Sequence, residues 1–216
     1  MEITELMAQR HSVRQYTAAP IEPQKRAELS ALAEELNRTA GLHIQIFYEE
    51  PKCFNSMMAH YGKFSGVRNY IALVGPNTPQ LEETLGRCGE QLVLKTQELG
   101  LSTCWVAMTH GKSQAAISKN EKQVCLISLG YGVTQGVAHT SKPVEAVSNY
   151  KADMPAWFLS GVQAALLAPT AMNQQKFYFE LQPDGSVKTT CSKGFYTKLD
   201  LGIVKYHFEL GSGRKL

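Results

Sequence analysis

Hydrophobic residues recur along the chain at two spacings, which predict the order of helices and strands. Spacings of three and four residues predict helices over residues 2–9, 24–39, 79–99, 112–119, 155–166 and 200–210. Alternation or short apolar runs predict strands over residues 43–48, 70–75, 102–107, 123–129, 176–181 and 187–191. Because helical and extended segments alternate, the pattern predicts a mixed α and β fold, but it does not fix the order of the strands.

Two further features of the pattern bear on the organisation of the chain. Residues 51–69 follow neither spacing, and so long an irregular connection is unusual unless it serves a site. A new section begins near Asp153, at the start of an apolar helix. We therefore expect a larger part over residues 1–150 and a shorter one over residues 151–216, closely packed or joined in one domain.

The composition is that of a globular protein and argues against several classes of function. The 216 residues are 44% hydrophobic and 19% charged, an ordinary balance for a folded chain. A net charge of +3 without a basic run argues against nucleic acid binding. No apolar segment is long enough for a membrane span and the first residues are acidic, so we expect a cytoplasmic protein. Five scattered cysteines without a CxxC pair indicate neither a disulfide framework nor a metal site.

The densest group of candidate ligands follows the first predicted helix, at residues 10–16. Arg10 and Arg14 stand four residues apart, with His11 and Ser12 between them. A guanidinium presents a planar set of donors that suits phosphate, and a serine hydroxyl adds a short donor. One interpretation is a pocket for an anionic, phosphorylated ligand. The other is a solvated basic turn, which the segment favours when it is taken alone.

A second polar group lies between the helix predicted to end near Leu166 and the strand at residues 176–181. Residues 168–175 combine a proline turn, the Thr170 hydroxyl and several side-chain amides. Amides donate and accept hydrogen bonds, which suits the edge of a heterocycle. A structural turn needs only the proline and one capping residue, and this interpretation stays equally open.

Other segments narrow the chemistry. Residues 99–105 place small residues before Trp105, and Gly130 and Gly132 follow a buried strand, so both segments could border a ligand, although a plain core strand explains them too. The sequence contains no GxGxxG, P-loop, HExxH or GxSxG motif. Side chains must therefore hold any phosphate, and we nominate no catalytic residue and no metal ligand.

Taken together, these segments resemble the nitroreductase family of FMN-dependent oxidoreductases. Residues 10–16 resemble its N-terminal arginine and serine motif, residues 100–105 its GLGTCW-like strand, residues 130–132 its late GYP, and residues 168–174 its APSxxNxQ loop. In ordinary members this loop follows the first long helix, whereas here it lies beyond residue 150. The chain therefore resembles bacterial members with two fused half-units. This resemblance implies an α+β, nitroreductase-like fold, with helices around a mixed β-sheet, arranged as a single-chain pseudo-dimer.

The resemblance also implies roles for individual residues around an FMN. The N-terminal motif would hold the phosphate and ribityl chain through Arg10, His11, Ser12 and Arg14. The late loop would cover the isoalloxazine ring through Pro169, Thr170, Ala171 and Asn173. Backbone groups of Val106 and Ala107 would lie near the flavin N5 edge, and Lys142 would be a late phosphate ligand.

The implied activity is that of an FMN-dependent NAD(P)H oxidoreductase. NADH or NADPH would act as a transient co-substrate, and ping-pong hydride transfer through FMN would reduce a small-molecule acceptor such as a nitroaromatic or a quinone. We expect a monomeric pseudo-dimer or a loose homodimer, with no nucleic acid or membrane partner. One alternative is a flavin- or nucleotide-binding protein without efficient turnover, which the rearranged motif order keeps open. Another is a structural protein without a flavin.

Overall fold

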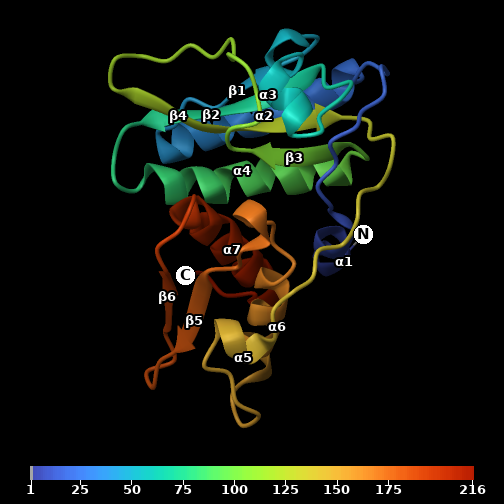
Figure 1. Cartoon of the computed structure of the whole chain (residues 1–216). Coiled ribbons are helices and arrows are strands. Elements are labelled where there is room, and N and C mark those ends of the chain that lie inside the picture. Colours follow the sequence, from blue (N-terminus) through green and yellow to red (C-terminus); the bar gives the residue numbers. More distant parts are fainter. Residues whose placement is uncertain (1) are drawn as a thin grey trace. The chain divides into compact units, whose positions relative to one another are not determined.

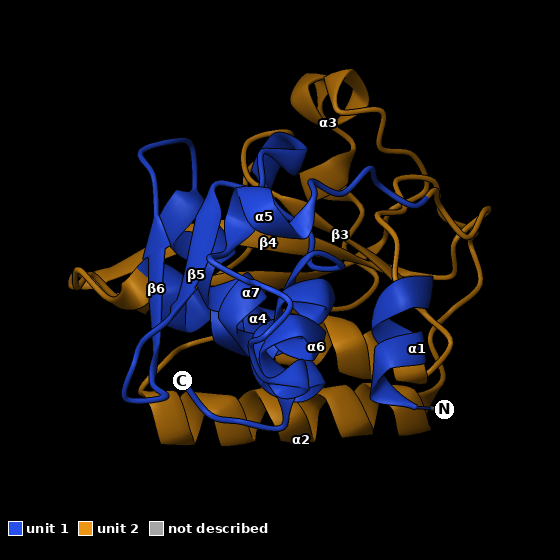
Figure 2. Cartoon of the chain, turned by 90° about the horizontal axis from the view of Figure 1, so that it is seen from below, with its two compact units in different colours: residues 1–9, 82–90, 138–216 blue, residues 10–81, 91–137 orange. Residues whose placement is uncertain are grey.

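Residues 2–216 are described by a computed structural model, in which the chain divides into two units (Figures 1 and 2). Unit 1 holds residues 1–9, 82–90 and 138–216, and unit 2 holds residues 10–81 and 91–137. Figure 2 draws unit 1 in blue and unit 2 in orange, and shows that each is assembled from separate stretches of the chain. The division differs from the expected boundary at residue 150, because unit 1 also takes in an N-terminal helix and a stretch near the middle of the chain.

Unit 2 is built on a four-stranded sheet with the strand order β1-β2-β4-β3. The strands are β1 (Gln45–Phe47), β2 (Asn69–Pro76), β3 (Ser102–Val106) and β4 (Glu121–Gly130). All neighbouring pairs of these strands are antiparallel. A mixed sheet was expected to contain parallel strands, but among residues 2–216 parallel pairing occurs only as single bridges, such as that between Ser12 and Thr103.

The core of unit 2 lies against this sheet. Side chains alternate across β2, so that Tyr70, Ala72 and Val74 share a face with Cys104 and Val106 of β3 in one buried apolar cluster. The other face of β2 is also buried, because its whole length up to Gly75 is shielded from solvent. A strand covered on both faces explains why residues 70–75 are continuously apolar.

Helix α2 (Pro23–Ala40) confirms the helix predicted over residues 24–39. Pro23 starts the helix, where a missing N–H leaves no hydrogen bond unmade, and Gly41 ends it in the left-handed conformation with φ of 63°. Helix α4 (Leu81–Glu98) contributes residues 82–90 to unit 1 and its remaining residues to unit 2. Within unit 2, Lys95 of α4 forms an ion pair with Glu28 of α2 at 2.9 Å.

The helix predicted over residues 112–119 is wrong. Residues 111–118 are irregular. The other stretch without a regular pattern, residues 51–69, contains the short helices η1 (Lys52–Phe54) and α3 (Met57–Tyr61). The Gln114 N–H donates to the Tyr70 hydroxyl at 2.9 Å, and the Gln45 side-chain amide bonds both backbone groups of Ala116, at 2.8 and 2.9 Å. These distant partners satisfy backbone groups that a helix would have paired internally.

Unit 1 is mainly helical and includes a two-stranded hairpin (Figure 1). Its elements are α1 (Ile3–Gln9), α5 (Val144–Val147), α6 (Ala156–Ala165), η2 (Ala171–Asn173), β5 (Phe177–Leu181), β6 (Val187–Cys191) and α7 (Thr197–Ser212). Helices α6 and α7 approach closely because Gly161 leaves room for the Phe208 ring. Phe179 of the hairpin stacks on the same ring, with centroids 4.6 Å apart. None of the described helices has the length and apolar character that a membrane crossing requires.

Candidate functional site

The eleven residues expected around a flavin form two groups, one in each unit. Unit 2 contains the six residues of the N-terminal motif and of the end of β3, which are Arg10, His11, Ser12, Arg14, Val106 and Ala107. Unit 1 contains the five residues of the late segments, which are Lys142, Pro169, Thr170, Ala171 and Asn173. Each group lies within a single unit. The expectation that both groups contact one flavin stays a prediction.

In unit 2, the basic segment runs beside β3 instead of continuing as a helix. Helix α1 ends at Gln9, Ser12 forms a parallel bridge with Thr103, and the Val13 N–H donates to the Thr103 carbonyl at 2.9 Å. Side chains alternate along an extended segment, so Arg10, Ser12 and Arg14 fall on the same side.

All three side chains influence the buried Cys104 thiol of β3. Burial raises the pKa of Cys104, while the charge of Arg14, a hydrogen bond with Ser12 and the charge of Arg10 lower it in part. Two positive charges and one hydroxyl of the basic segment therefore act on the same buried thiol. Arg10 is buried, with 3% of its surface exposed, whereas Arg14 is exposed and packs its guanidinium 6.0 Å from the centre of the Phe64 ring.

The backbone on either side fixes the basic segment. The Ser65 N–H donates to the Arg14 carbonyl and the Tyr16 N–H to the Ser65 carbonyl, both at 3.0 Å. Gly66 has a φ of 70°, and a Cβ there would collide with the Tyr16 carbonyl oxygen. On the other side, a Cβ at Gly132 would lie 2.9 Å from the Val13 side chain. Close backbone approach thus holds the motif in place.

The other three residues of the unit 2 group are His11, Val106 and Ala107. His11 lies against Gly136, where a Cβ would stand 2.7 Å from the His11 Cβ, and it is half-buried. The Val106 side chain belongs to the apolar core and is 2% exposed. Ala107 is half-buried. The expected contact of Val106 with the flavin through its backbone stays a prediction.

In unit 1, residues 169–175 form a tight loop with an unusual backbone. Met172, Asn173 and Gln175 have positive φ angles of 52°, 54° and 45°. Residues other than glycine rarely adopt this backbone conformation. Each such residue costs about 1–3 kcal/mol, which the surrounding structure must offset. The loop nevertheless exposes 81% of the Met172 side chain.

Amide side chains tie this loop to residues 139–142. The buried Gln175 amide donates to the Thr140 carbonyl at 2.9 Å and to the Asn173 side-chain oxygen at 2.8 Å. Asn173 itself donates to the Thr140 carbonyl at 2.9 Å. The Asn173 amide, expected to lie over the flavin, is therefore engaged at its oxygen by Gln175 of the loop and at its nitrogen by Thr140.

Lys142 takes part in the same anchoring. Its ammonium donates to the carbonyls of Gln174 and Gln175 at 2.9 Å, and its backbone N–H donates to the Gln175 side-chain oxygen at 2.8 Å. This geometry gives Lys142 a role in holding the loop, and its expected role as a phosphate ligand stays a prediction.

Asp200, in the first turn of α7, anchors the opposite side of the loop. Its carboxylate accepts a hydrogen bond from the Ala171 N–H at 2.9 Å and another from the Gln174 side chain at 2.8 Å. Only 4% of Asp200 is exposed. Burial raises the pKa of its carboxyl to about 6, and the two hydrogen bonds oppose that rise.

Comparison with known proteins decides the family. Residues 2–212 match the family model described as "Putative TM nitroreductase". The chain belongs to this nitroreductase family. No curated protein sequence matches it. The α+β fold expected from the resemblance is confirmed, since solved structures of nitroreductase family proteins match this chain.

Three solved structures illustrate the shared fold. A "putative nitroreductase" from Thermotoga maritima is 21% identical and matches 98% of this chain and 83% of its own, with a TM-score of 0.72. A "Putative NADH dehydrogenase/NAD(P)H nitroreductase" from Bacteroides thetaiotaomicron is 16% identical, covering 67% and 95%, with a TM-score of 0.54. A "Putative NADH Oxidase" from Clostridium acetobutylicum is 17% identical, covering 68% and 99%, with a TM-score of 0.52.

Sequence reasoning missed the residues that hold the loop of this nitroreductase family member. Gln174 and Gln175 could be recognised in the sequence as amides of the loop. Their side chains reach Asp200 and Thr140 only because of the positive φ angles that follow Ala171. Asp200 carried a weaker signal, a single carboxylate in the first turn of a mostly apolar helix. Its link to Ala171 spans 29 residues, which no local pattern reveals.

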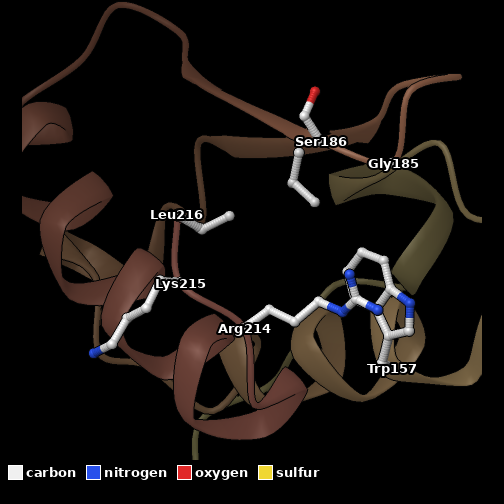
Figure 3. Close-up of a pocket in the computed structure, with 7 residues that line it drawn as sticks. Trp157, Gly185, Ser186, Arg214, Lys215 and Leu216 are labelled. Carbon is white, nitrogen blue, oxygen red and sulfur yellow. The ribbon is translucent and has the colours of Figure 1, made fainter.

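The cleft drawn in Figure 3 lies away from the candidate residues of unit 1. It has a volume of about 360 Å³ and lies between Trp157 of α6, the hairpin turn at residues 185–187 and residues 214–216. The Arg214 guanidinium lies 4.1 Å from the centre of the Trp157 ring. Lys142 and the loop at 169–175 are absent from its walls, so the cleft is not part of the candidate site.

Within residues 2–216, no group of three or more His, Cys, Asp or Glu side chains could hold a metal ion. The two groups of candidate residues offer two kinds of chemistry. Unit 2 offers a cluster of guanidinium and hydroxyl donors, and unit 1 offers a rigid loop that presents backbone and apolar groups.

Proposed function

We propose that this nitroreductase family member is an FMN-dependent NAD(P)H oxidoreductase. In this proposal the donors of unit 2 hold the FMN phosphate and ribityl chain, and the loop of unit 1 covers the isoalloxazine ring. NADH or NADPH supplies the electrons, and a nitroaromatic, a quinone or a similar small acceptor takes them in a second half-reaction. The solved structures named above, two of them described with NADH or NAD(P)H, support the proposal at the level of fold.

The donor set of unit 2 fits the phosphate end of FMN. A phosphate monoester carries up to two negative charges and has three oxygens free to accept hydrogen bonds. Arg10 and Arg14 supply two positive charges and planar donors, and Ser12 adds a hydroxyl from the same side of the segment. The placement of Arg10, Ser12 and Arg14 along one side of the extended segment beside β3 is the observation that carries the proposal.

The loop of unit 1 fits a planar ring rather than a charge. Pro169, Thr170 and Ala171 are half-exposed, and Met172 extends into solvent. A polarisable methionine and small neighbouring residues suit contact with a flat aromatic surface. When bound, FMN would supply a ring that accepts a hydride and passes it on. The chain itself binds, orients and shields that ring, and needs no catalytic acid or base of its own.

Substitution of the two arginines tests the phosphate assignment. The double variant Arg10→Ala with Arg14→Ala should lose FMN retention, because it removes both charges that would neutralise the phosphate. Each charge-assisted hydrogen bond is worth about 1.5–3 kcal/mol, so the dissociation constant should rise by at least about a hundredfold. Fluorescence titration with FMN measures it.

The matched control is Arg38→Ala, which removes an exposed arginine near the end of α2. It should bind FMN like the unaltered chain. Because Arg10 is buried, circular dichroism must first show that the double variant is folded, and the single variant Arg14→Ala provides a milder test. Undiminished FMN content in the folded double variant would refute the phosphate assignment.

A further inference from the structure

Anchoring contacts surround the loop at residues 170–175 on two sides. Residues 140–142 hold it through the amides of Asn173 and Gln175. The start of α7 holds it through Asp200, whose two carboxylate oxygens take up Ala171 and Gln174 separately. The Gln174 amide also donates to the Phe195 carbonyl at 2.6 Å, just before α7. The contact with Asp200 fixes the loop to helix α7, and the contact with Phe195 fixes it to the turn just before that helix.

We propose that Asp200 is a positioning residue that fixes the backbone of residues 171–175 in the conformation presented to the flavin ring. The inference rests on the proposed function for its ligand, and on the contacts of unit 1 alone for the positioning itself. Asp200 does not touch the ligand in this proposal. It acts through Ala171 and Gln174, the two residues that it holds.

The loop's backbone explains why such an anchor is required. Three non-glycine residues within four positions hold positive φ angles, and such a conformation persists only where the surroundings over-determine it. A loop with only a structural role could relax into ordinary turns and bury its methionine. Here the anchors hold the strained backbone and leave Met172 exposed. This combination is typical of a surface that is organised before it binds.

The position of Asp200 makes its carboxylate suitable as an anchor. It lies in the first turn of α7, where the helix dipole favours negative charge. A carboxylate offers acceptors on both oxygens, which matches the two donors from the loop. An asparagine has nearly the same size but only one acceptor oxygen, so Asp200→Asn must lose at least one of the two hydrogen bonds.

Amide hydrogen exchange in the cofactor-free protein tests the positioning directly. In Asp200→Asn, the protection factors of the amides at Ala171, Asn173 and Gln175 should fall at least about tenfold, because one lost hydrogen bond corresponds to roughly that factor. Amides in the middle of α6 and α7 should keep their protection. Unchanged protection in the loop, or an equal loss throughout unit 1, would overturn the proposal.

Asp184→Asn is the matched control. Asp184 lies in the hairpin turn of the same unit, and its carboxylate also accepts two hydrogen bonds, from the Ser186 N–H and hydroxyl. The substitution makes the same chemical change away from the loop, so loop protection should stay as it is. If Asp200→Asn does not fold, Gln174→Met replaces it. That variant, at a half-exposed position, removes the side-chain donor to Asp200 and to the Phe195 carbonyl, and it should show the same local loss.

Two flavins separate the ring end from the phosphate end. Riboflavin contains the isoalloxazine ring without the phosphate. Asp200→Asn should weaken binding of FMN and riboflavin by the same factor, whereas Arg14→Ala should weaken binding of FMN more than that of riboflavin, because only FMN carries the phosphate. An effect of Asp200→Asn on FMN alone, or on neither flavin, would overturn its role toward the ring. If the unaltered chain binds neither flavin, the proposed function fails, and the protection factors alone decide whether Asp200 positions the loop.

Discussion

At Asp200, burial and hydrogen bonding act in opposite directions on one carboxyl group. Burial disfavours the charged form, and the donors from Ala171 and Gln174 favour it. Burial prevails, so the pKa rises from 3.8 to about 6. The folded protein therefore binds this proton more tightly than the unfolded chain does.

This shift predicts a pH dependence of stability. The contribution of Asp200 is fully present below pH 3.8 and is lost as the pH rises through about 6. The free energy of unfolding of the unaltered protein, relative to Asp200→Asn, should thus fall with rising pH across this window, by roughly 3 kcal/mol in total. Urea unfolding at several pH values measures the difference.

Asp184 should show a pH dependence of stability in the opposite direction. Hydrogen bonds from Ser186 lower the pKa of that exposed carboxyl, so its contribution should be present at higher pH and be lost as the pH falls. Stability relative to Asp184→Asn should accordingly change in the opposite direction. A difference for Asp200→Asn that is constant, or that rises with pH, would contradict the shift.

At the scale of elements, the segment at residues 12–17 depends on close backbone approach. Gly66 permits that approach, because it combines a φ of 70° with contact to the Tyr16 carbonyl. Gly41, at the end of α2, has a similar φ of 63° but open space around it. The two glycines therefore separate the cost of a left-handed conformation from the cost of a collision.

Substitution of Gly41 by alanine should cost about 1–2 kcal/mol, the price of a left-handed non-glycine residue. Gly66→Ala should cost about 1–3 kcal/mol more, because the added methyl group forces the strand-like segment away. It should also weaken FMN binding, since Arg14 and Ser12 move with the segment. Chemical denaturation and FMN titration measure both effects, and equal destabilisation by the two variants would argue against the collision.

Local patterns predicted the elements that local forces determine. Helix α2 follows from apolar spacing, from Pro23 at its start and from Gly41 at its end. The hairpin turn follows from Asp184 and Gly185. Residues 112–119 had a weak helical pattern, but their backbone groups bond to the side chains of Tyr70 and Gln45, which lie 44 and 71 residues away. Sequence periodicity has no access to such contacts, and the order of the strands was unpredictable for the same reason.

The candidate site shows the same division. The grouping of Arg10, Ser12 and Arg14 as candidate phosphate ligands could be predicted from their spacing. The extended backbone that puts them on one side could not, because it depends on pairing with Thr103. The anchoring of the late loop could not. It depends on Asp200 and Gln175 meeting groups on other segments, and on three positive φ angles that no residue type in the loop requires.

At the scale of the whole molecule, this nitroreductase family member contains two units that are built differently. Unit 2 carries the four-stranded sheet and the arginine motif, and unit 1 carries the helices and the late loop. Both groups of candidate residues belong to the same chain. We therefore expect one FMN for each chain, in a monomer or a loose homodimer.

The most direct test of the account is a visible absorbance titration of the purified chain. FMN is added to saturation under anaerobic conditions, followed by NADH or NADPH and then by a quinone or a nitroaromatic compound. The account predicts saturable uptake of one FMN per chain, loss of the flavin absorbance band on addition of NADH or NADPH, and its return with the acceptor. A chain that takes up no FMN, or one whose bound FMN neither nucleotide can bleach, would contradict it.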